Sequence, residues 1–328
     1  MPIVKARLKD GREVLVADLI EGKIENPGFP ISYIRAATED RPWDGSPHVT
    51  ALLNGTRETF LKYVSKYTVD LDGMTIPMAG TKFHSNMENP VDITEIHLSF
   101  YGIQGISDLL DVHPQTGELS IVDYKLVGSF ALKKWLGIVS TLVPEMDDFG
   151  NPVYLKSGRN KGSQKMKKEI VMDPTKADRF NYTMQVNIYR VLLEAVLNSA
   201  ETIEKFPKLK PHFGKKVSKL QIFYVLRDGN LNHDFSFNSY LEDAEIYPDE
   251  KVVNFIEMRA TAIKMVMDKF ESLSATEVNP FVAAKSVCPG LCSDDETWHG
   301  KKCESYCPVA RACYAITPRE GGPEWNQS

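Results

Sequence analysis

The chain has 328 residues, of which 42% are hydrophobic and 25% are charged, and its formal net charge is −5 at pH 7. This composition is ordinary for a globular protein with a substantial core, and the net charge argues against nucleic-acid binding over the whole surface, though not against a local basic groove. The charged N-terminus lacks the apolar core of a signal peptide, and no later segment is long enough to span a bilayer. We therefore expect a cytoplasmic protein with no membrane partner.

The first part of the chain predicts a hairpin, a connector, two helices and three strands. Residues 5–16 alternate around an Asp-Gly turn, as in a β-hairpin, and the proline-rich segment 24–48 is typical of a connector. An apolar stripe over residues 49–67 predicts one helix with Gly55 inside it. The sequence AGTKFHSNMEN (79–89) predicts a short helix with His84 and Glu88 on one face. Three strands are then expected in the segment that ends at residue 127.

The second part predicts a long helix, a strand and a second long helix. The first helix begins near residues 176–179, since apolar side chains recur there at every fourth position. A strand is expected at 218–229, and an amphipathic helix with acidic residues in its first turn at 249–273. This order of elements indicates an α/β fold with a mixed central sheet flanked by helices.

We divide the chain into three parts. Residues 1–48 form an N-terminal hairpin and connector, and residues 49–279 form the core, with an insertion at about 128–178. Residues 280–328 form a C-terminal cysteine segment and a tail that we expect to be disordered.

The strand around residue 123 carries charge in an apolar setting. Asp123 and Lys125 point to the same face because strand side chains alternate, and Asp108 lies in a similar setting on the preceding strand. Unpaired buried charge is costly, whereas Mg²⁺ takes carboxylate ligands together with substrate phosphate. Asp108 and Asp123 are therefore candidate metal ligands, and Lys125 can orient a water molecule or stabilise developing charge. The alternative is an Asp123–Lys125 ion pair at a sheet edge.

The cysteines all lie in one C-terminal window: Cys288, Cys292, Cys303, Cys307 and Cys313. Such a cluster in a chain without a secretion signal indicates a metal or iron–sulfur site, not disulfides. Four of the five thiolates would bind either a [4Fe–4S] cluster or a structural Zn²⁺ ion. We favour the iron–sulfur cluster because of the closing C-x5-C spacing, and expect either centre to be structural.

Five segments occur in an order that matches a known set of motifs: GTKFHSNME (80–88), GISDLLD (105–111), IVDYK (121–125), QVNIY (185–189) and CESYCPVARAC (303–313). Together they resemble the PD-(D/E)XK nuclease superfamily. More narrowly they resemble its RecB-like exonuclease branch, which includes the CRISPR-associated RecB-like exonucleases and the AddB nuclease domain. The resemblance covers roughly residues 50–313 and implies a restriction-endonuclease-like core.

The resemblance implies a role for each matching residue. The ligands of Mg²⁺ or Mn²⁺ would be His84, Asp108, Asp123 and the carbonyl of Tyr124. Lys125 would be the catalytic lysine, and Gln185 and Tyr189, one helical turn apart, would support the lysine or phosphate region and contact DNA.

Alternatives remain for several of these residues. Asp111 is a second candidate for the first acid, and His84, Gln185 and Tyr189 are each compatible with ordinary structural positions. Glu95 and His97 are near enough to be accessory groups, although a strand surface suits both better.

One departure concerns the cysteines. Iron-bearing relatives place one cluster cysteine near the helix before the histidine motif, and the corresponding segment LLNGTRETFLKYV (52–64) contains none. The fourth thiolate would therefore come from Cys288 or Cys292. A cluster built in this way would tie the C-terminal segment to itself and not to that helix.

The insertion carries a run of basic side chains without an acid: Lys156, Arg159, Lys161, Lys165, Lys167 and Lys168. Our hypothesis is a flap or clamp that contacts DNA phosphates. The alternative is a solvated loop.

Taken together, the resemblance implies a metal-dependent DNA nuclease, and an exonuclease more than an endonuclease, acting in recombination, repair or replication. The chain has no G-x-x-x-x-G-K-[ST] loop, so a helicase or recombination protein would be a separate partner. One alternative is a non-catalytic DNA-binding or assembly module of a recombination or spacer-acquisition complex that retains the nuclease fold. Another is a zinc-binding scaffold with accidental motifs.

Overall fold

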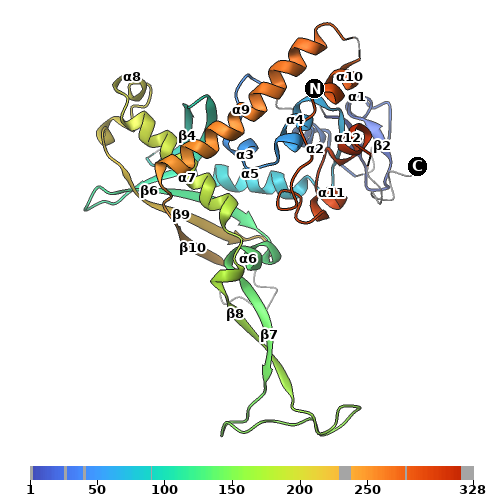
Figure 1. Ribbon diagram of the computed structural model, residues 1–328, viewed down its shortest axis with the longest axis vertical. Coiled ribbons are helices and arrows are strands. Elements are labelled where there is room, and N and C mark those ends of the chain that lie inside the picture. The colour runs from blue at the N-terminus through green and yellow to red at the C-terminus, as the bar shows by residue number, and fades with distance from the viewer. Residues whose placement is uncertain are drawn as a thin grey trace.

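The computed structural model describes residues 3–25, 28–39, 42–89, 91–228, 238–277 and 279–318. Within these ranges the strands form a five-stranded central sheet, a small three-stranded sheet and a two-stranded ribbon. The ribbon projects far from the body of the molecule (Figure 1).

The central sheet has the strand order β10-β9-β6-β5-β4. Strands β4 (Ile93–Phe100), β5 (Ile103–Val112) and β6 (Leu119–Val127) are consecutive and antiparallel, which confirms the three predicted strands. Strand β9 (Val217–Leu226) runs parallel to β6, and the unpredicted β10 (Ser239–Ala244) pairs antiparallel with β9. The sheet is therefore mixed, and the predicted α/β class with flanking helices is confirmed.

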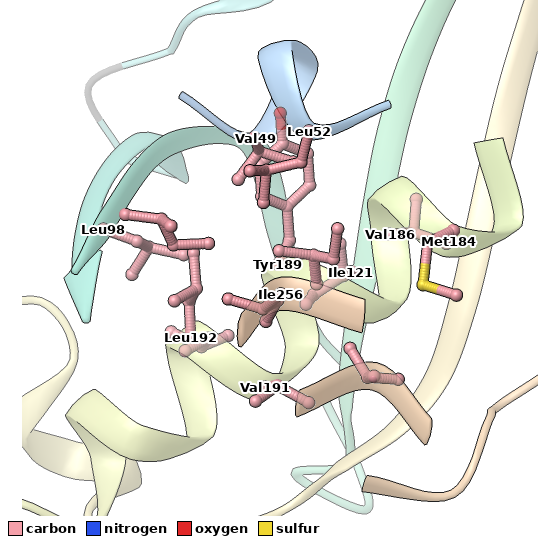
Figure 2. Close-up of a cluster of buried hydrophobic side chains, with 14 of the residues drawn as sticks. Val49, Leu52, Leu98, Ile121, Met184, Val186, Tyr189, Val191, Leu192 and Ile256 are labelled. Atoms are coloured by element: carbon pink, nitrogen blue, oxygen red, sulfur yellow. The ribbon is translucent and has the colours of Figure 1, made fainter. Parts of the chain in front are cut away.

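The main core lies between this sheet and two long helices. Helix α7 (Phe180–Leu197) packs against β4, β5, β6 and β9, and α9 (Asp249–Ser274) packs on α7. Figure 2 shows the apolar side chains between them, including Ile121, Leu192 and Ile256, which are fully buried. Both helices were predicted, because their apolar periodicity is long and regular.

The predicted helix over residues 49–67 is instead two helices, α3 (Val49–Leu52) and α4 (Thr56–Val64). Gly55 is the N-cap of α4, so the glycine starts a helix and does not interrupt one. Helix α5 (Thr75–Met87) begins earlier than predicted and ends before Glu88. Glu88 therefore does not share a helical face with the histidine four residues earlier.

The N-terminal residues form a small module with its own core. Strands β1 (Ile3–Arg7) and β2 (Glu13–Leu15) make the predicted hairpin, followed by α1 (Val16–Ile20). Helix α2 (Ile31–Ala37) lies inside the segment expected to be a connector, and β3 (Tyr67–Asp70) pairs parallel with β1. This second core draws on both sides of residue 48 and contains Ala6, Leu8, Leu19, Ile34, Ala37, Val69 and Leu71.

The insertion contains helix α6 (Ser129–Leu136) and the projecting ribbon of β7 (Ile138–Pro144) and β8 (Met166–Met172). The sequence had indicated a flap here but not this ribbon. Short helical turns complete the connections of α7: η1 (Pro174–Lys176), α8 (Ala200–Ile203) and η2 (Lys210–His212).

The C-terminal segment contains α10 (Pro280–Val287), α11 (Lys301–Ser305) and α12 (Ala310–Ile316). Helix α10 packs against α9 and α4, and α12 packs against α4. The tail expected to be disordered, residues 319–328, lies outside the described residues. In the parts of the chain that are described, no helix has the length and apolar character needed to cross a bilayer.

Candidate metal-binding site

Three candidate ligands converge where α5 meets β4 and β5. Nδ1 of His84 lies 3.2 Å from Oδ1 of Asp108, and one ligand atom each of His84, Glu95 and Asp108 lies within 4.8 Å of the others. Among the residues that the structure describes, no other group of three or more His, Cys, Asp or Glu side chains meets this spacing. One nitrogen and several carboxylate oxygens are suitable donors for a divalent cation.

Aromatic contacts hold α5 against β6. The ring of Tyr124 meets the rings of Phe83 and His84 edge-on, with 6.3 Å between centroids in each pair. Edge-to-face geometry at this distance is favourable. These contacts fix the imidazole of His84 beside the strand that carries Asp108.

The Asp108 carboxylate is held from two sides. Its Oδ2 accepts a hydrogen bond from the backbone N–H of Tyr124 at 2.7 Å, while Oδ1 faces His84. The β5–β6 register, which pairs Leu109 with Val122, sets Asp108 opposite Asp123. Asp111, the alternative first acid, is exposed and pairs with Ser120 farther along the strand, so Asp108 is the acid at the site.

Glu95 belongs to this group of candidate ligands, although the sequence favoured a plain strand-surface position for it. Its backbone φ is 48°, in the left-handed region. The ladder pairs Thr94 with Leu109 and Ile96 with Ser107, which leaves Glu95 opposite Asp108 without a ladder pair. A left-handed non-glycine residue costs about 1–3 kcal/mol and such residues cluster at functional sites. The structure therefore places Glu95, which is half-buried, beside two candidate ligands, where the sequence favoured a plain strand surface.

The environment of Glu95 is unfavourable to its negative charge. Burial raises the pKa of its carboxyl, and the charges of Asp108 and Glu88 raise it further. His97, its neighbour on the strand, is exposed, as expected.

The sequence did contain a signal for the position of Glu95: Tyr101-Gly102 is a two-residue hairpin loop with positive φ at both positions. Such a loop fixes the strand register and so sets Glu95 opposite Asp108.

Asp123 and Lys125 form an ion pair in a nearly dry setting, which confirms that they share a face. The Asp123 side chain is 2% exposed and that of Lys125 is 15% exposed. Burial raises the pKa of Asp123 to about 6, although Lys125 opposes this shift. The ion pair anticipated as an alternative is thus present, and it lies beside the His84–Asp108 pair instead of at a sheet edge.

A cluster of aromatic rings, the aromatic wall of Tyr182, Trp135 and Tyr224, packs beside Lys125. The ammonium lies 5.1 Å from the centre of the Tyr182 ring, a cation–π distance. Tyr182 contacts Trp135 edge-on at 4.3 Å between centroids, and Trp135 stacks on Tyr224 at 5.9 Å. The Tyr224 hydroxyl in turn donates a hydrogen bond to Glu242 at 3.1 Å. Lys125 is therefore positioned by a carboxylate and by packed rings.

Gln185 and Tyr189 lie on the same side of α7, as their spacing predicts. Nε2 of Gln185 donates a hydrogen bond to the Tyr189 hydroxyl at 3.1 Å. Tyr189 is only 4% exposed and packs in the core (Figure 2), and burial together with the Asp123 charge raises its pKa. Gly105 permits this packing, because a Cβ there would lie 2.9 Å from the Tyr189 ring. In the described structure Tyr189 is a core residue, whereas the resemblance implied a contact with DNA.

The charges at this end of the sheet do not balance. Glu95 and Asp108 are close together, and Asp123 lies opposite Asp108. Among the described residues, Lys125 is the one cation that forms an ion pair with any of the three besides the titratable His84. Carboxylates removed from water in this way are costly without a compensating cation. The donor set fits Mg²⁺ or Mn²⁺, and a bound divalent cation would supply the missing charge.

The cysteine segment forms a second candidate centre. Four of its thiols line one cavity of about 20 Å³: Cys292, Cys303, Cys307 and Cys313. Burial raises the pKa of Cys307 to about 12 and that of Cys288 to about 11, so these thiols are protonated at neutral pH. The sulfurs surround the cavity without reaching the spacing of the His84 group.

Helix α4 anchors this segment without a cysteine of its own. The Arg57 guanidinium donates to Cys313 Sγ at 3.0 Å and to the Pro289 carbonyl at 2.7 Å. Lys302 Nζ lies 2.5 Å from Glu58 Oε2. A Cβ at Gly55 would lie 2.6 Å from Cys292 Sγ, so Cys292 fills the space beside the start of α4.

The basic run does not form one surface. Lys167 and Lys168 are adjacent on β8 and point to opposite faces, and Lys165 pairs with Glu145 at 2.9 Å. The other three basic residues lie in the loop 154–164 at the far end of the ribbon.

Comparisons with known proteins add little to this description. No family model matches the sequence, and no curated protein matches it. One solved structure, described as "Crystal structure of SSO0001", is similar at a TM-score of 0.36 and 12% sequence identity, covering 92% of this chain and 97% of that one. A TM-score of this size does not establish a shared fold.

Proposed function

We propose that this protein is a Mg²⁺- or Mn²⁺-dependent deoxyribonuclease with a restriction-endonuclease-like core. The observation that carries the proposal is the convergence of His84, Glu95 and Asp108 beside the buried Asp123–Lys125 pair. Hydrolysis of a phosphodiester needs a hard cation and a positioned ammonium in the same place. The motif order in the sequence agrees with this chemistry and resembles that of the RecB-like branch.

The chain's own groups have separable tasks in this proposal. His84, Glu95, Asp108 and Asp123 would hold the cation, with the Tyr124 carbonyl as a further donor. When bound, the cation would polarise the phosphate and acidify a water molecule. Lys125 would bind a phosphate oxygen or orient that water. The water's oxygen forms a bond to phosphorus as the bond from phosphorus to the leaving oxygen breaks; the water releases a proton to solvent and the leaving oxygen takes one up. The aromatic wall around Tyr182 restricts where the ammonium can go.

Exonuclease action at DNA ends is the preferred form, because the motif set resembles exonucleases, and a separate helicase or recombination protein would supply any motor. We also propose a thiolate-bound centre in the cysteine segment, with [4Fe–4S] preferred to Zn²⁺. The preference for iron–sulfur rests on the closing C-x5-C spacing in the sequence. The four thiols that line one cavity are the candidate ligands of either centre. Visible absorption with iron and sulfide analysis separates the iron–sulfur cluster from colourless zinc protein.

The nuclease proposal is tested with end-labelled DNA and Mn²⁺. Lys125→Ala should lower the cleavage rate by about 10³-fold, as expected for a group that stabilises transition-state charge. Lys219→Ala is the matched control, because Lys219 is also a strand lysine paired with an aspartate, Asp243, at 3.1 Å. Intact DNA with the wild-type protein, or equal cutting by both variants, would refute the proposal. DNA binding without cutting would favour the non-catalytic assembly module.

A further inference from the structure

The most isolated part of the fold is the arm, residues 138–172. Its strands pair from Ile138 with Met172 to Pro144 with Met166, and it projects away from the helices and sheets of the body (Figure 1). A two-stranded ribbon alone is marginally stable in water. The arm therefore presents a surface that gains stability from a partner.

One face of the arm is largely apolar. Directly paired residues of an antiparallel ribbon share a face. Six of the eight residues on this face are apolar, Ile138, Leu142, Pro144, Met166, Ile170 and Met172, and the other two are Ser140 and Lys168. Leu142 is 69% exposed, and Met166 and Met172 are each 46% exposed. Apolar side chains gathered on one exposed surface mark a contact with another protein.

The end of the arm divides into two loops (Figure 1). The backbone N–H of Glu145 donates to the Lys165 carbonyl at 2.8 Å, and the N–H of Lys165 donates to the Val153 carbonyl at 2.7 Å. These bonds join the bases of the loops 146–152 and 154–164. Both loops therefore extend from one hydrogen-bonded junction.

The two loops carry opposite charge. The acidic loop, 146–152, contains two aspartates and no basic residue, and the basic loop, 154–164, contains Lys156, Arg159 and Lys161 and no acid. The acidic loop also presents Phe149, which is 89% exposed. Asp147 is used within its loop, where its carboxylate accepts hydrogen bonds from the backbone N–H groups of Phe149 and Asn151.

We propose that the arm is a self-association surface whose partner is the arm of a second copy of this chain. A two-fold interface requires a self-complementary patch. A two-fold rotation sets the acidic loop of each copy beside the basic loop of the other, and it brings the apolar faces together. Phe149 supplies the large aromatic anchor that interfaces of this kind use. The proposal does not depend on nuclease activity.

DNA fits this surface less well. Phosphate contacts need basic side chains on one face, whereas Lys167 and Lys168 lie on opposite faces and Lys165 is neutralised by Glu145. The apolar face offers a phosphate backbone one basic side chain, that of Lys168, among apolar neighbours. Only that lysine and the basic loop would remain for such a contact.

Sedimentation of the full chain over a concentration series tests the proposal. Wild type should dimerise, and Leu142→Glu should raise the dimer Kd by about 100-fold, since each copy would lose an apolar contact and would place an ion pair with Lys168 in the interface, where desolvation is costly. Thr141→Lys, on the opposite face, should leave the Kd unchanged. Both variants place opposite charges across the ribbon, Leu142→Glu against Lys168 and Thr141→Lys against Glu169, so neither should disturb the arm itself.

A charge exchange tests the pairing of the loops. One variant carries Lys156→Glu, Arg159→Glu and Lys161→Glu, and the other carries Asp148→Lys and Asn151→Lys. Each should dimerise poorly alone, and an equimolar mixture should restore association. A monomeric wild type, or a mixture that fails to associate, would overturn the proposal. A monomer whose DNA affinity falls in the triple variant would also overturn it and assign the arm to DNA.

Discussion

Two of the buried charge clusters in the described part of the chain are balanced in opposite ways. Where α4 meets the cysteine segment, Glu58 is 4% exposed and is held by Lys62 and Lys302. These cations outweigh the burial that opposes them, so the pKa of Glu58 lies below its usual range. At the candidate metal site, burial and neighbouring acids raise the pKa of Glu95 and of Asp123.

The difference separates a structural cluster from one suited to a ligand. The α4 cluster is complete within the chain, because each carboxylate oxygen of Glu58 has an ammonium partner. The sheet cluster contains acids that its own lysine does not neutralise, and perturbed carboxylates of this kind concentrate at functional sites. Removing one charge should therefore damage the first cluster and relieve the second.

Paired substitutions test this difference most strongly. Glu58→Gln should lower the free energy of unfolding by about 3–5 kcal/mol, because it leaves the largely buried ammonium of Lys302 without its carboxylate partner. Glu95→Gln should leave the metal-free protein as stable as wild type or more so, since a disfavoured charge is removed. Chemical denaturation of both variants in chelator is the measurement. Equal losses in the two would show that the clusters do not differ.

The next largest effect on stability is expected when the space beside the N-terminus of α4 is filled. Gly55→Ala places a Cβ 2.6 Å from Cys292 Sγ and 3.2 Å from Glu296 Oε2. Overpacking of this kind costs about 1–3 kcal/mol, and we expect a lower metal or iron content in the cysteine segment. Gly80→Ala is the control, because it lies in α5 with nothing within 4 Å of a new Cβ and should be neutral or slightly stabilising. A Gly55→Ala protein with full stability and metal content would contradict the close packing.

The sequence predicted features of the site that depend on local structure and missed those that depend on contacts between distant segments. Asp123 and Lys125 could be placed together because strand side chains alternate at a fixed period. Glu95 was missed because the same alternation assigns it to the surface, and only its left-handed backbone and the register of the hairpin bring it to Asp108. The proximity of Cys292 to Gly55 depends on docking between distant segments, and no local pattern encodes that contact.

The arm was missed for a different reason. Residues 138–143, IVSTLV, are rich in β-branched side chains, which favour strands. Their partners at 166–172 contain three charged residues, and the loops between them are long. A ribbon exposed on both faces lacks the one-sided burial pattern by which strands are usually predicted. The β-branched run was therefore the available signal.

The pH dependence of Mn²⁺ binding is a further test of the raised pKa values at the candidate metal site. The hydrogen bond to Asp108 raises the pKa of His84, and burial raises the pKa of Glu95 and brings that of Asp123 to about 6. Ligands must lose their protons to bind a cation, so Mn²⁺ affinity should fall as the pH drops through 6. We expect about a tenfold loss per pH unit for each proton displaced.

Stability of the metal-free protein should change in the opposite direction. The folded state holds these protons more tightly than the unfolded chain, so this site's contribution to stability is present at low pH and is lost as the pH rises through about 6. Calorimetric Mn²⁺ titrations between acidic and neutral pH check the expected fall in Mn²⁺ affinity at low pH. Glu95→Gln should reduce the slope, and an affinity independent of pH in wild type would contradict the assignment of these ligands.

The smallest effect is expected at Tyr182, which would act on the proposed reaction through Lys125. Its ring lies 5.1 Å from the ammonium and is supported by Trp135. Tyr182→Leu removes the cation–π contact, worth about 0.5–2 kcal/mol, and should lower the cleavage rate at most about 30-fold while leaving Mn²⁺ affinity unchanged. Tyr182→Phe keeps the ring and should restore the rate and its pH profile. A similar loss in both variants would assign the effect to the hydroxyl or to packing, and would refute positioning of Lys125 by the ring.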